Sequence, residues 1–157
     1  MKLAVVYLSI ALASGLVMVT VYNTLVDAKS WGAGIPASIH AARDYYKHVD
    51  PRRFYLIIGP PNLVLSLLTV ILFWNTARTL RFYFGAAFVL YAAIVILTVT
   101  YFIPRDLILF NRPIVDLEMV RTAARQWSQM NWLRTFLGCA GVLLSCKGLD
   151  IYYRIMK

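Results

Sequence analysis

Residues 3–26 read LAVVYLSIALASGLVMVTVYNTLV and contain no charged side chain. As an α-helix, a segment of this length exceeds the about 20 residues needed to cross the roughly 30 Å of hydrocarbon in a bilayer. Two further uncharged segments of similar length follow, at 54–77 and 82–104. Each of the three is predicted to form a transmembrane helix.

A fourth span is predicted at 132–153, where the sequence is less uniform. Arg134 and Lys147 lie inside this segment, and both can extend their charged ends toward the membrane surfaces along flexible stems. The sequence therefore predicts an all-α, integral membrane four-helix bundle that forms one domain over residues 1–157. Four spans also place both termini on the same side of the membrane.

The first segment has one competing interpretation, as a cleaved signal peptide. Lys2 supplies a basic start, and Ala11-Leu12-Ala13 resembles a cleavage site. The apolar run continues past that point to Val26, which favours a retained helix.

The composition points to a membrane rather than to nucleic acid. Hydrophobic residues make up 61% of the chain, and the mean hydropathy is +0.67, whereas soluble domains are about half apolar. The net charge of +9 comes from residues that flank the spans, where they meet anionic headgroups. We expect membrane lipids as partners, no nucleic acid, and possible homo-oligomers.

The orientation depends on how the basic residues are counted. Lys and Arg near span ends mark the cytoplasmic side. The end with the termini has the higher density of Lys and Arg, which places the termini in the cytoplasm. The opposite end has more Lys and Arg in total, which gives the reverse orientation. The density count rests on Lys2, Arg78, Arg81, Arg154 and Lys157.

The two long connections are predicted to carry short amphipathic helices. Residues 36–48 can form one, with Pro36 in its first turn. Asp50-Pro51 has the pattern of an N-cap that begins the second span. Apolar residues recur at helical spacing over 114–130, so this segment can lie on the bilayer, cap the bundle or continue into the fourth span.

Two features within the spans have a packing and a binding interpretation. Gly59-Pro60-Pro61-Asn62 predicts a kink that leaves a carbonyl and the amide of Asn62 inside the bundle. A stripe of small residues on the fourth span is typical of close helix packing, with a slot for a flat ligand as the alternative. The stripe consists of Gly138, Gly141, Ser145 and Gly148.

The two cysteines favour packing over redox chemistry. Cys139 and Cys146 lie seven residues apart on one predicted helix, which is too far for a disulfide along that helix. A thiol reductase is therefore disfavoured.

His40, Asp44 and His48 share one face of the first connecting helix, because each is four residues from the next. A carboxylate between imidazoles can orient one of them as a general base. A metal site and a solvated helix face with helpful charge pairs are the alternatives. With Glu118 as the only glutamate, a ferritin-like di-iron centre is not supported, and we predict no metal.

Trp127, Asn131 and Arg134 form the second candidate set, at the start of the fourth span. An ionisable residue at this depth is a functional candidate. The three offer an aromatic wall, an amide and a fixed cation, which suit an oxyanion on a planar ligand. Anchoring at the headgroups is the alternative.

The remaining candidates for substrate binding belong to the same membrane face. Arg105 and Asp106 end the third span, and Arg43 lies in the first connection. Asn62 comes directly after the proline pair. Together with Trp127, these four residues are predicted to contact the substrate.

The pattern resembles a group of small four-helix membrane proteins that include the anthrone oxygenases of polyketide pathways. Thr100 and Pro104 match its motif at the end of the third span, and the fourth span opens with a matching Trp-x-x-x-Asn-x-x-Arg-Thr string. Asp106 departs from the group, which usually has Asn there. The matching string consists of Trp127, Asn131, Arg134 and Thr135.

The resemblance implies an oxidoreductase that oxidises an apolar phenolic or polycyclic substrate with O₂, without a cofactor. A base forms a carbanion and other groups hold the resulting oxyanion. His40, oriented by Asp44, is the expected base. Arg134 and Asn131 are expected to hold the oxyanion, and Trp127 to stack on the ring.

A non-catalytic membrane module that binds lipid or assembles with partner proteins is the alternative. It explains the small-residue stripe and the basic flanks without an active site. A transporter is less favoured because the sequence shows no inverted repeat.

Overall fold

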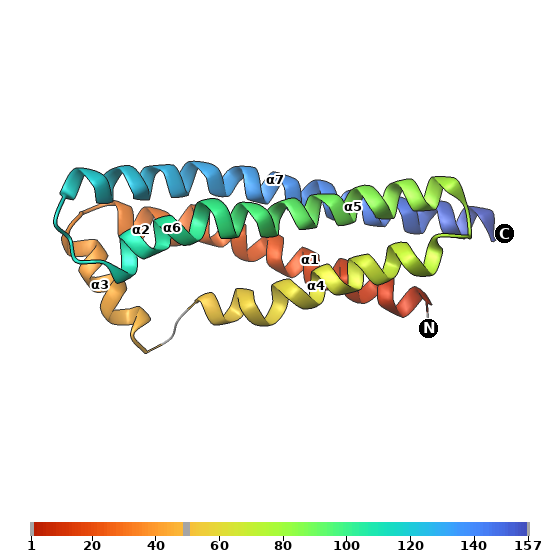
Figure 1. Ribbon diagram of the computed structural model, residues 1–157, viewed down its shortest axis with the longest axis horizontal. Helices are drawn as coiled ribbons and strands as arrows, with labels where there is room; N and C mark the ends of the chain where they lie inside the picture. Colours follow the sequence, from red (N-terminus) through yellow and green to blue (C-terminus); the bar gives the residue numbers. More distant parts are fainter. Residues whose placement is uncertain (1, 49–50, 157) are drawn as a thin grey trace.

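The computed structural model describes residues 2–48 and 51–156, and this part of the chain contains helices and no strand. Four long helices lie side by side along the molecule (Figure 1). The prediction of an all-α membrane helical bundle is confirmed, because the four helical segments are long and apolar enough to span a membrane. The long helices are α1 (Lys2–Tyr22), α4 (Arg52–Phe73), α5 (Arg78–Leu97) and α7 (Leu117–Ile155).

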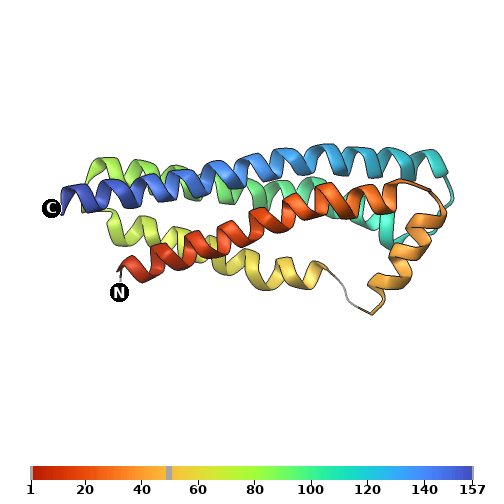
Figure 2. The same cartoon turned by 180° about the vertical axis from the view of Figure 1, so that it is seen from behind.

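The four helices form a closed ring in which each packs against two others. α4 contacts α1 and α5, and α7 contacts α5 and α1. Neighbours run in opposite directions, so both termini and the short α4–α5 turn lie at one end of the bundle (Figure 1, and from behind in Figure 2). Both long connections lie at the other end, as predicted.

Three π-helical turns extend two of the spans beyond their predicted limits. α1 continues through η1 (Asn23–Asp27) into α2 (Ala28–Gly32). α5 continues through η2 (Thr98–Phe102), α6 (Ile103–Asp106) and η3 (Leu107–Asn111). The four membrane-capable segments are Lys2–Gly32, Arg52–Phe73, Arg78–Asn111 and Leu117–Ile155.

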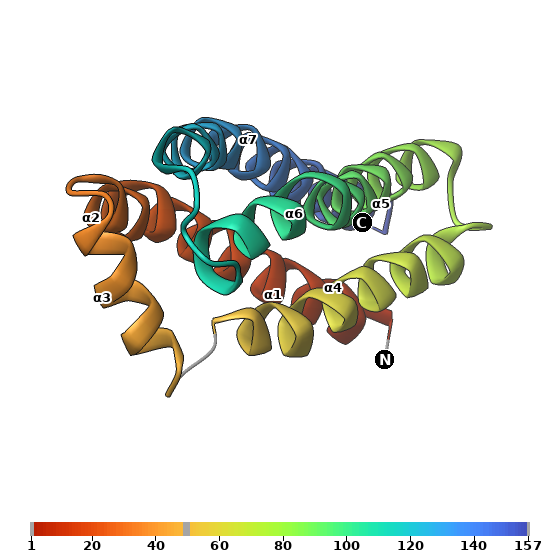
Figure 3. The same cartoon turned by 60° about the vertical axis from the view of Figure 1, so that its left-hand side comes forward.

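The two connections differ in kind. The first contains α3 (Ala37–Tyr46), close to the predicted 36–48, and its Ile39 is fully buried. Figure 3 shows α3 turned away from the direction of the bundle. In the second, the amphipathic segment continues without a break into the fourth span as α7, whose first turn is capped by Asp116 through Glu118 N and Met119 N.

The start and middle of α4 bear on two further predictions. Pro51 precedes α4 as its N-cap residue, whereas Asp50, the predicted capping side chain, lies outside the described residues. The helix continues through Pro60 and Pro61, and Asn62 is buried with its Oδ1 unpartnered in the described part of the chain.

The small-residue stripe of α7 is filled by the neighbouring helices. A Cβ at Gly138 would lie 2.7 Å from Val17 of α1, and one at Gly141 would lie 2.5 Å from Tyr91 of α5. At Gly148 the distance to Phe84 of α5 would be 2.6 Å. The packing interpretation is therefore confirmed, and no slot for a flat ligand is left there.

Candidate functional site

Arg134 lies inside the bundle, near the end that carries the long connections. Its guanidinium carbon is 4.3 Å from the ring centre of Phe102, 5.2 Å from Tyr55 and 5.6 Å from Trp127. Only 5% of the residue is exposed. Aromatic faces stabilise a desolvated cation, so three rings from η2, α4 and α7 make a cage for this charge.

The cage leaves part of the guanidinium without partners. Nε and Nη2 of Arg134 are buried and reach no hydrogen-bond acceptor in residues 2–48 and 51–156. Ring faces offset some of the desolvation cost, but an unpaired N–H on a buried charge remains expensive. These two donors are therefore unsatisfied within the described residues.

Tyr55 is hydrogen-bonded to the side-chain amide of Asn23 in η1. The orientation of Asn23 that gives each amide atom a suitable partner has Oδ1 accepting from Tyr55 Oη at 2.5 Å. Its Nδ2 then donates to Asp27 Oδ2 at 2.9 Å and to the Val19 carbonyl at 3.2 Å. Asn23 thus fixes both a ring of the cage and a carboxylate beside it.

A second carboxylate holds Trp127. The indole Nε1 donates to Asp106 Oδ1 at 2.8 Å, which orients another ring of the cage. Burial, with smaller contributions from the charges of Asp27 and Asp106, raises the pKa of Tyr46 of α3 to about 12. Asp106 is thus bonded to one ring of the cage, and Asp27 is linked to another through Asn23.

Asn131 is completely buried one turn before Arg134. Its Nδ2 donates to the Thr20 carbonyl at 2.8 Å and to Thr24 Oγ1 at 2.5 Å, while Thr135 Oγ1 donates to Thr20 Oγ1 at 3.0 Å. Both amide hydrogens are thus engaged by α1 and η1, whereas Oδ1 has no partner in the described part of the chain. The amide offers an acceptor rather than the donor expected for an oxyanion.

His40 and Asp44 lie outside this cluster, exposed on α3. Asp44 pairs with Lys47 at 2.7 Å, and that hydrogen bond and charge lower the pKa of the Asp44 carboxyl. The basic role of His40 stays a prediction. His48 is exposed as well, and no group of three or more potential metal-ligating side chains occurs within the described ranges.

The two predicted arginine contacts hold the connections together. Arg43 donates to the carbonyls of Leu109 and Ile108 at 2.8 and 3.3 Å, which satisfies the end of η3. Arg105 donates to Gln126 Oε1 from Nε at 3.1 Å and from Nη2 at 2.9 Å. Its guanidinium carbon lies 3.3 Å from the ring centre of Tyr101. Their guanidinium groups are therefore engaged by the protein itself.

The structure brings together Trp127, Asn131, Arg134 and Asp106 from the predicted set. Sequence reasoning missed Asn23, Asp27, Tyr55 and Phe102, which complete the cluster. Their positions depend on the π-turns and on the diagonal approach of α4 to α7. The one available signal was their common placement near the same predicted membrane face.

Part of the chain matches a known protein family. Residues 52–144 match the family described as anthrone oxygenase. The match covers more than half of the chain and includes Tyr55, Phe102, Asp106, Trp127, Asn131 and Arg134. No significant match was found among curated proteins or among solved structures. The chain therefore belongs to the anthrone oxygenase family.

Proposed function

We propose that the protein oxidises an apolar phenolic or polycyclic substrate with O₂ at the Arg134 cage. The observation that carries the proposal is the buried guanidinium among three aromatic rings, two of whose donors have no partner in the described part of the chain. Such a site matches an oxyanion on a flat apolar body better than it matches a hydrated ion.

Each feature of the cage has a counterpart in such a substrate. Nε and Nη2 of Arg134 suit an enolate or phenolate oxygen, and Asn131 Oδ1 suits a neighbouring phenolic hydroxyl. The surface of α4 around Tyr55 is apolar, with Leu56 and Ile57 widely exposed. A substrate dissolved in the bilayer can therefore approach the site from the lipid.

The proposed reaction converts a CH₂ group beside the aromatic system into a carbonyl. A base removes one proton, and the resulting carbanion shares its charge with the oxygen held by Arg134. The carbanion carbon bonds to O₂, which is reduced to the peroxide level. Loss of water from the peroxide then gives C=O, so that CH₂ and O₂ yield C=O and H₂O.

We assign the base to Asp27 in place of His40. Asn23 holds the Asp27 carboxylate beside Tyr55, a ring of the cage, whereas His40 is exposed on α3. Asp106, bonded to the Trp127 indole, acts as a positioning residue for that ring. The proposal includes no cofactor.

The test measures O₂ consumption and quinone absorbance with purified protein and 1,8-dihydroxyanthrone as the probe, after subtraction of autoxidation. Arg134→Ala is expected to reduce turnover by about 10²–10³-fold, the loss typical when an oxyanion donor is removed. Arg125→Ala is the matched control, because Arg125 is exposed on the same helix. Undiminished turnover by folded Arg134→Ala protein would refute the proposal.

The non-catalytic module gains no specific support from the fold. Its main argument was the small-residue stripe, and that stripe is occupied by Val17, Tyr91 and Phe84 of the same chain. Wild-type protein that leaves the anthrone probe unchanged would favour the module again.

A further inference from the structure

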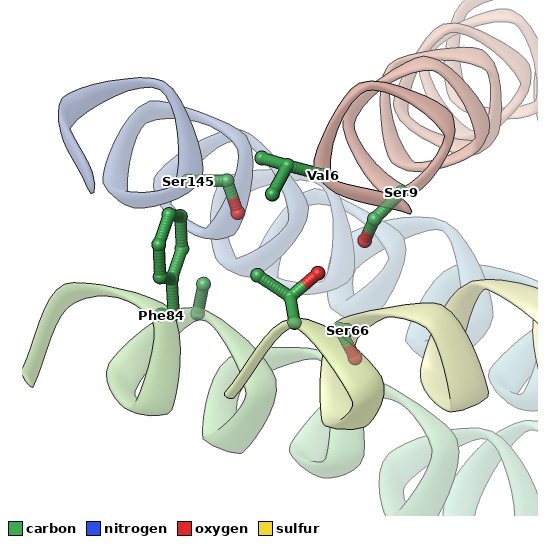
Figure 4. Close-up of a pocket in the computed structure, with 7 residues that line it drawn as sticks. Val6, Ser9, Ser66, Phe84 and Ser145 are labelled. Carbon is green, nitrogen blue, oxygen red and sulfur yellow. The ribbon is translucent and has the colours of Figure 1, made fainter. Parts of the chain in front are cut away.

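A small cavity lies between α1, α4, α5 and α7, away from the Arg134 cage, and Figure 4 shows the residues that line it. Its volume is about 10 Å³, close to what one water molecule needs. Ser9 of α1 and Ser145 of α7 are each eleven residues from Thr20 and Arg134 respectively, about 16 Å along a helix. The cavity is therefore a separate site, and its occupancy does not depend on the function proposed for the cage.

Three hydroxyl groups that line the cavity donate their hydrogen to a backbone carbonyl of their own helix. Ser66 Oγ donates to the Leu63 carbonyl at 2.8 Å, and Thr69 Oγ1 donates to the Leu65 carbonyl at 2.8 Å. Ser145 Oγ donates to the Gly141 carbonyl at 2.9 Å. Because each hydrogen is already used within its own helix, these three oxygens can only accept. Ser145 Oγ also lies 3.4 Å from Tyr91 Oη and can accept from it.

Ser9 is the complementary group. It is 3% exposed and lines the cavity, so its hydroxyl can bond to a ligand held there. Figure 4 shows Ser9 and Ser145 on separate helices on the two sides of Val6, with Ser66 on a third helix. A hydrogen bond from Ser9 to a ligand in the cavity would offset the cost of burying that hydroxyl.

We propose that this cavity binds one water molecule, which accepts a hydrogen bond from Ser9 and donates two to the hydroxyl oxygens of α4 and α7. A water molecule has two hydrogens to donate to two of the three acceptors and a lone pair to accept from Ser9, so it makes three hydrogen bonds in the cavity. A metal cation fits less well, because no lining residue is acidic and its charge would be uncompensated. The bound water joins α1, α4 and α7 at the bundle centre.

The proposal is tested by whether Ser9→Ala raises or lowers the unfolding temperature of the protein in detergent. If water is bound, the variant loses a bridge and the unfolding temperature falls, by about 2–4 °C for a loss near 1 kcal/mol in a chain of this size. If the cavity is empty, Ser9→Ala removes a buried hydroxyl that bonds to no water, and the unfolding temperature stays the same or rises. The second result overturns the proposal.

A double-mutant cycle supplies the second measurement. Ser9→Ala and Thr69→Val are expected to be non-additive, because one water links both hydroxyls although neither bonds to the other. Thr98→Val is the control partner, since Thr98 makes the same bond to its own helix, to Ile94 O at 2.8 Å, away from the cavity. Additive effects of Ser9→Ala and Thr69→Val would overturn the bridge.

The nature of the ligand is tested by exchanging salts. Water as the ligand predicts the same unfolding temperature in sodium, potassium and choline chloride at equal ionic strength. A selective rise in sodium that disappears in Ser9→Ala overturns the assignment in favour of a cation. The same comparison of salts is made with Ser66→Ala on α4, because its result does not depend on a folding defect caused at Ser9.

Discussion

At the scale of single residues, the site is defined by groups that the fold leaves unsatisfied. Arg134 Nε and Nη2 and Asn131 Oδ1 are buried without partners in the described ranges, while the surrounding threonines and Asn23 are fully engaged. Buried donors and acceptors without partners destabilise a fold and are therefore rare in folded proteins. Those on adjacent turns of α7 are expected to bind a ligand.

The assignment of the base predicts opposite outcomes for two variants. Asp27→Asn keeps the shape of the side chain but removes the basic carboxylate, so turnover of the anthrone probe should fall at least about 10²-fold. Probe binding, followed by quenching of tryptophan fluorescence, should change little because Arg134 is intact. His40→Ala should leave both unchanged, and the reverse pattern would restore His40 as the base.

Tyr46 makes the stability of the fold depend on pH in the alkaline range. Its pKa is about 12 in the fold and 10.0 without it, so the folded state holds the phenolic proton more tightly. This contribution to stability is complete below pH 10 and is lost as the pH rises from about 10 to 12. Tyr46→Phe should lose less stability across that interval in thermal unfolding, with the exposed Tyr45→Phe as control. An unchanged pH profile would contradict this effect.

The sequence predicted part of the site for a physical reason. Trp127, Asn131 and Arg134 lie on one helix, and their spacing alone puts them near one another. Tyr55 and Phe102 reach Arg134 from two other helices, and no local pattern contains that tertiary contact. His40 and Asp44 also share a helix face, but helical spacing does not reveal whether that face points inward.

At the scale of secondary structure elements, α7 packs closely because three glycines remove side chains where α1 and α5 approach. Gly141→Ala places a Cβ 2.5 Å from the Tyr91 ring, and that ring is held in the core by the helices around it. Either α5 or α7 has to move.

We therefore expect Gly141→Ala to lower stability by about 1–3 kcal/mol, the usual cost of overpacking a core. Gly15→Ala is the matched control, since no described residue comes within 4 Å of a Cβ there, and the change should be neutral or slightly stabilising. Unfolding in mixed micelles measures both. Equal stability of the two variants would mean that the helices separate at little cost.

The existence of the four spans was predictable from charge-free length, because hydrocarbon excludes charges and demands a minimum of apolar residues. Their ends were not. Span three was expected to end at 104 and continues to Asn111, because π-turns and the Arg43 cap on the η3 carbonyls extend the helix past the charged pair Arg105-Asp106.

At the scale of the whole molecule, the topology separates two ends of different character. The termini and the α4–α5 turn share one end, and α3 with both long connections shares the other (Figure 1). The Arg134 cage lies toward the second end. The orientation in the membrane therefore decides from which compartment the site exchanges protons.

We predict that both termini face the cytoplasm, because the basic residues near that end are dense. A reporter that fluoresces only in the cytoplasm, fused to the C-terminus, should be active. A cysteine introduced at Ala37, which is exposed at the start of α3, should react with an impermeant reagent outside the cell. A silent reporter with an unreactive Ala37→Cys variant would reverse the orientation.

The π-turns have a consequence for how this family of chains can change. Each of η1, η2 and η3 holds a residue more than a regular helical turn would, so everything beyond it is rotated by about 100° relative to an ideal wheel. Removal of one residue from such a turn, such as Leu25 of η1, would restore a regular turn and leave the residues beyond it in place. Removal of a residue from the regular part of α1 would instead rotate the Asp27 carboxylate away from the cage. The π-turns are therefore the places in these spans where a single-residue change in length can be absorbed locally.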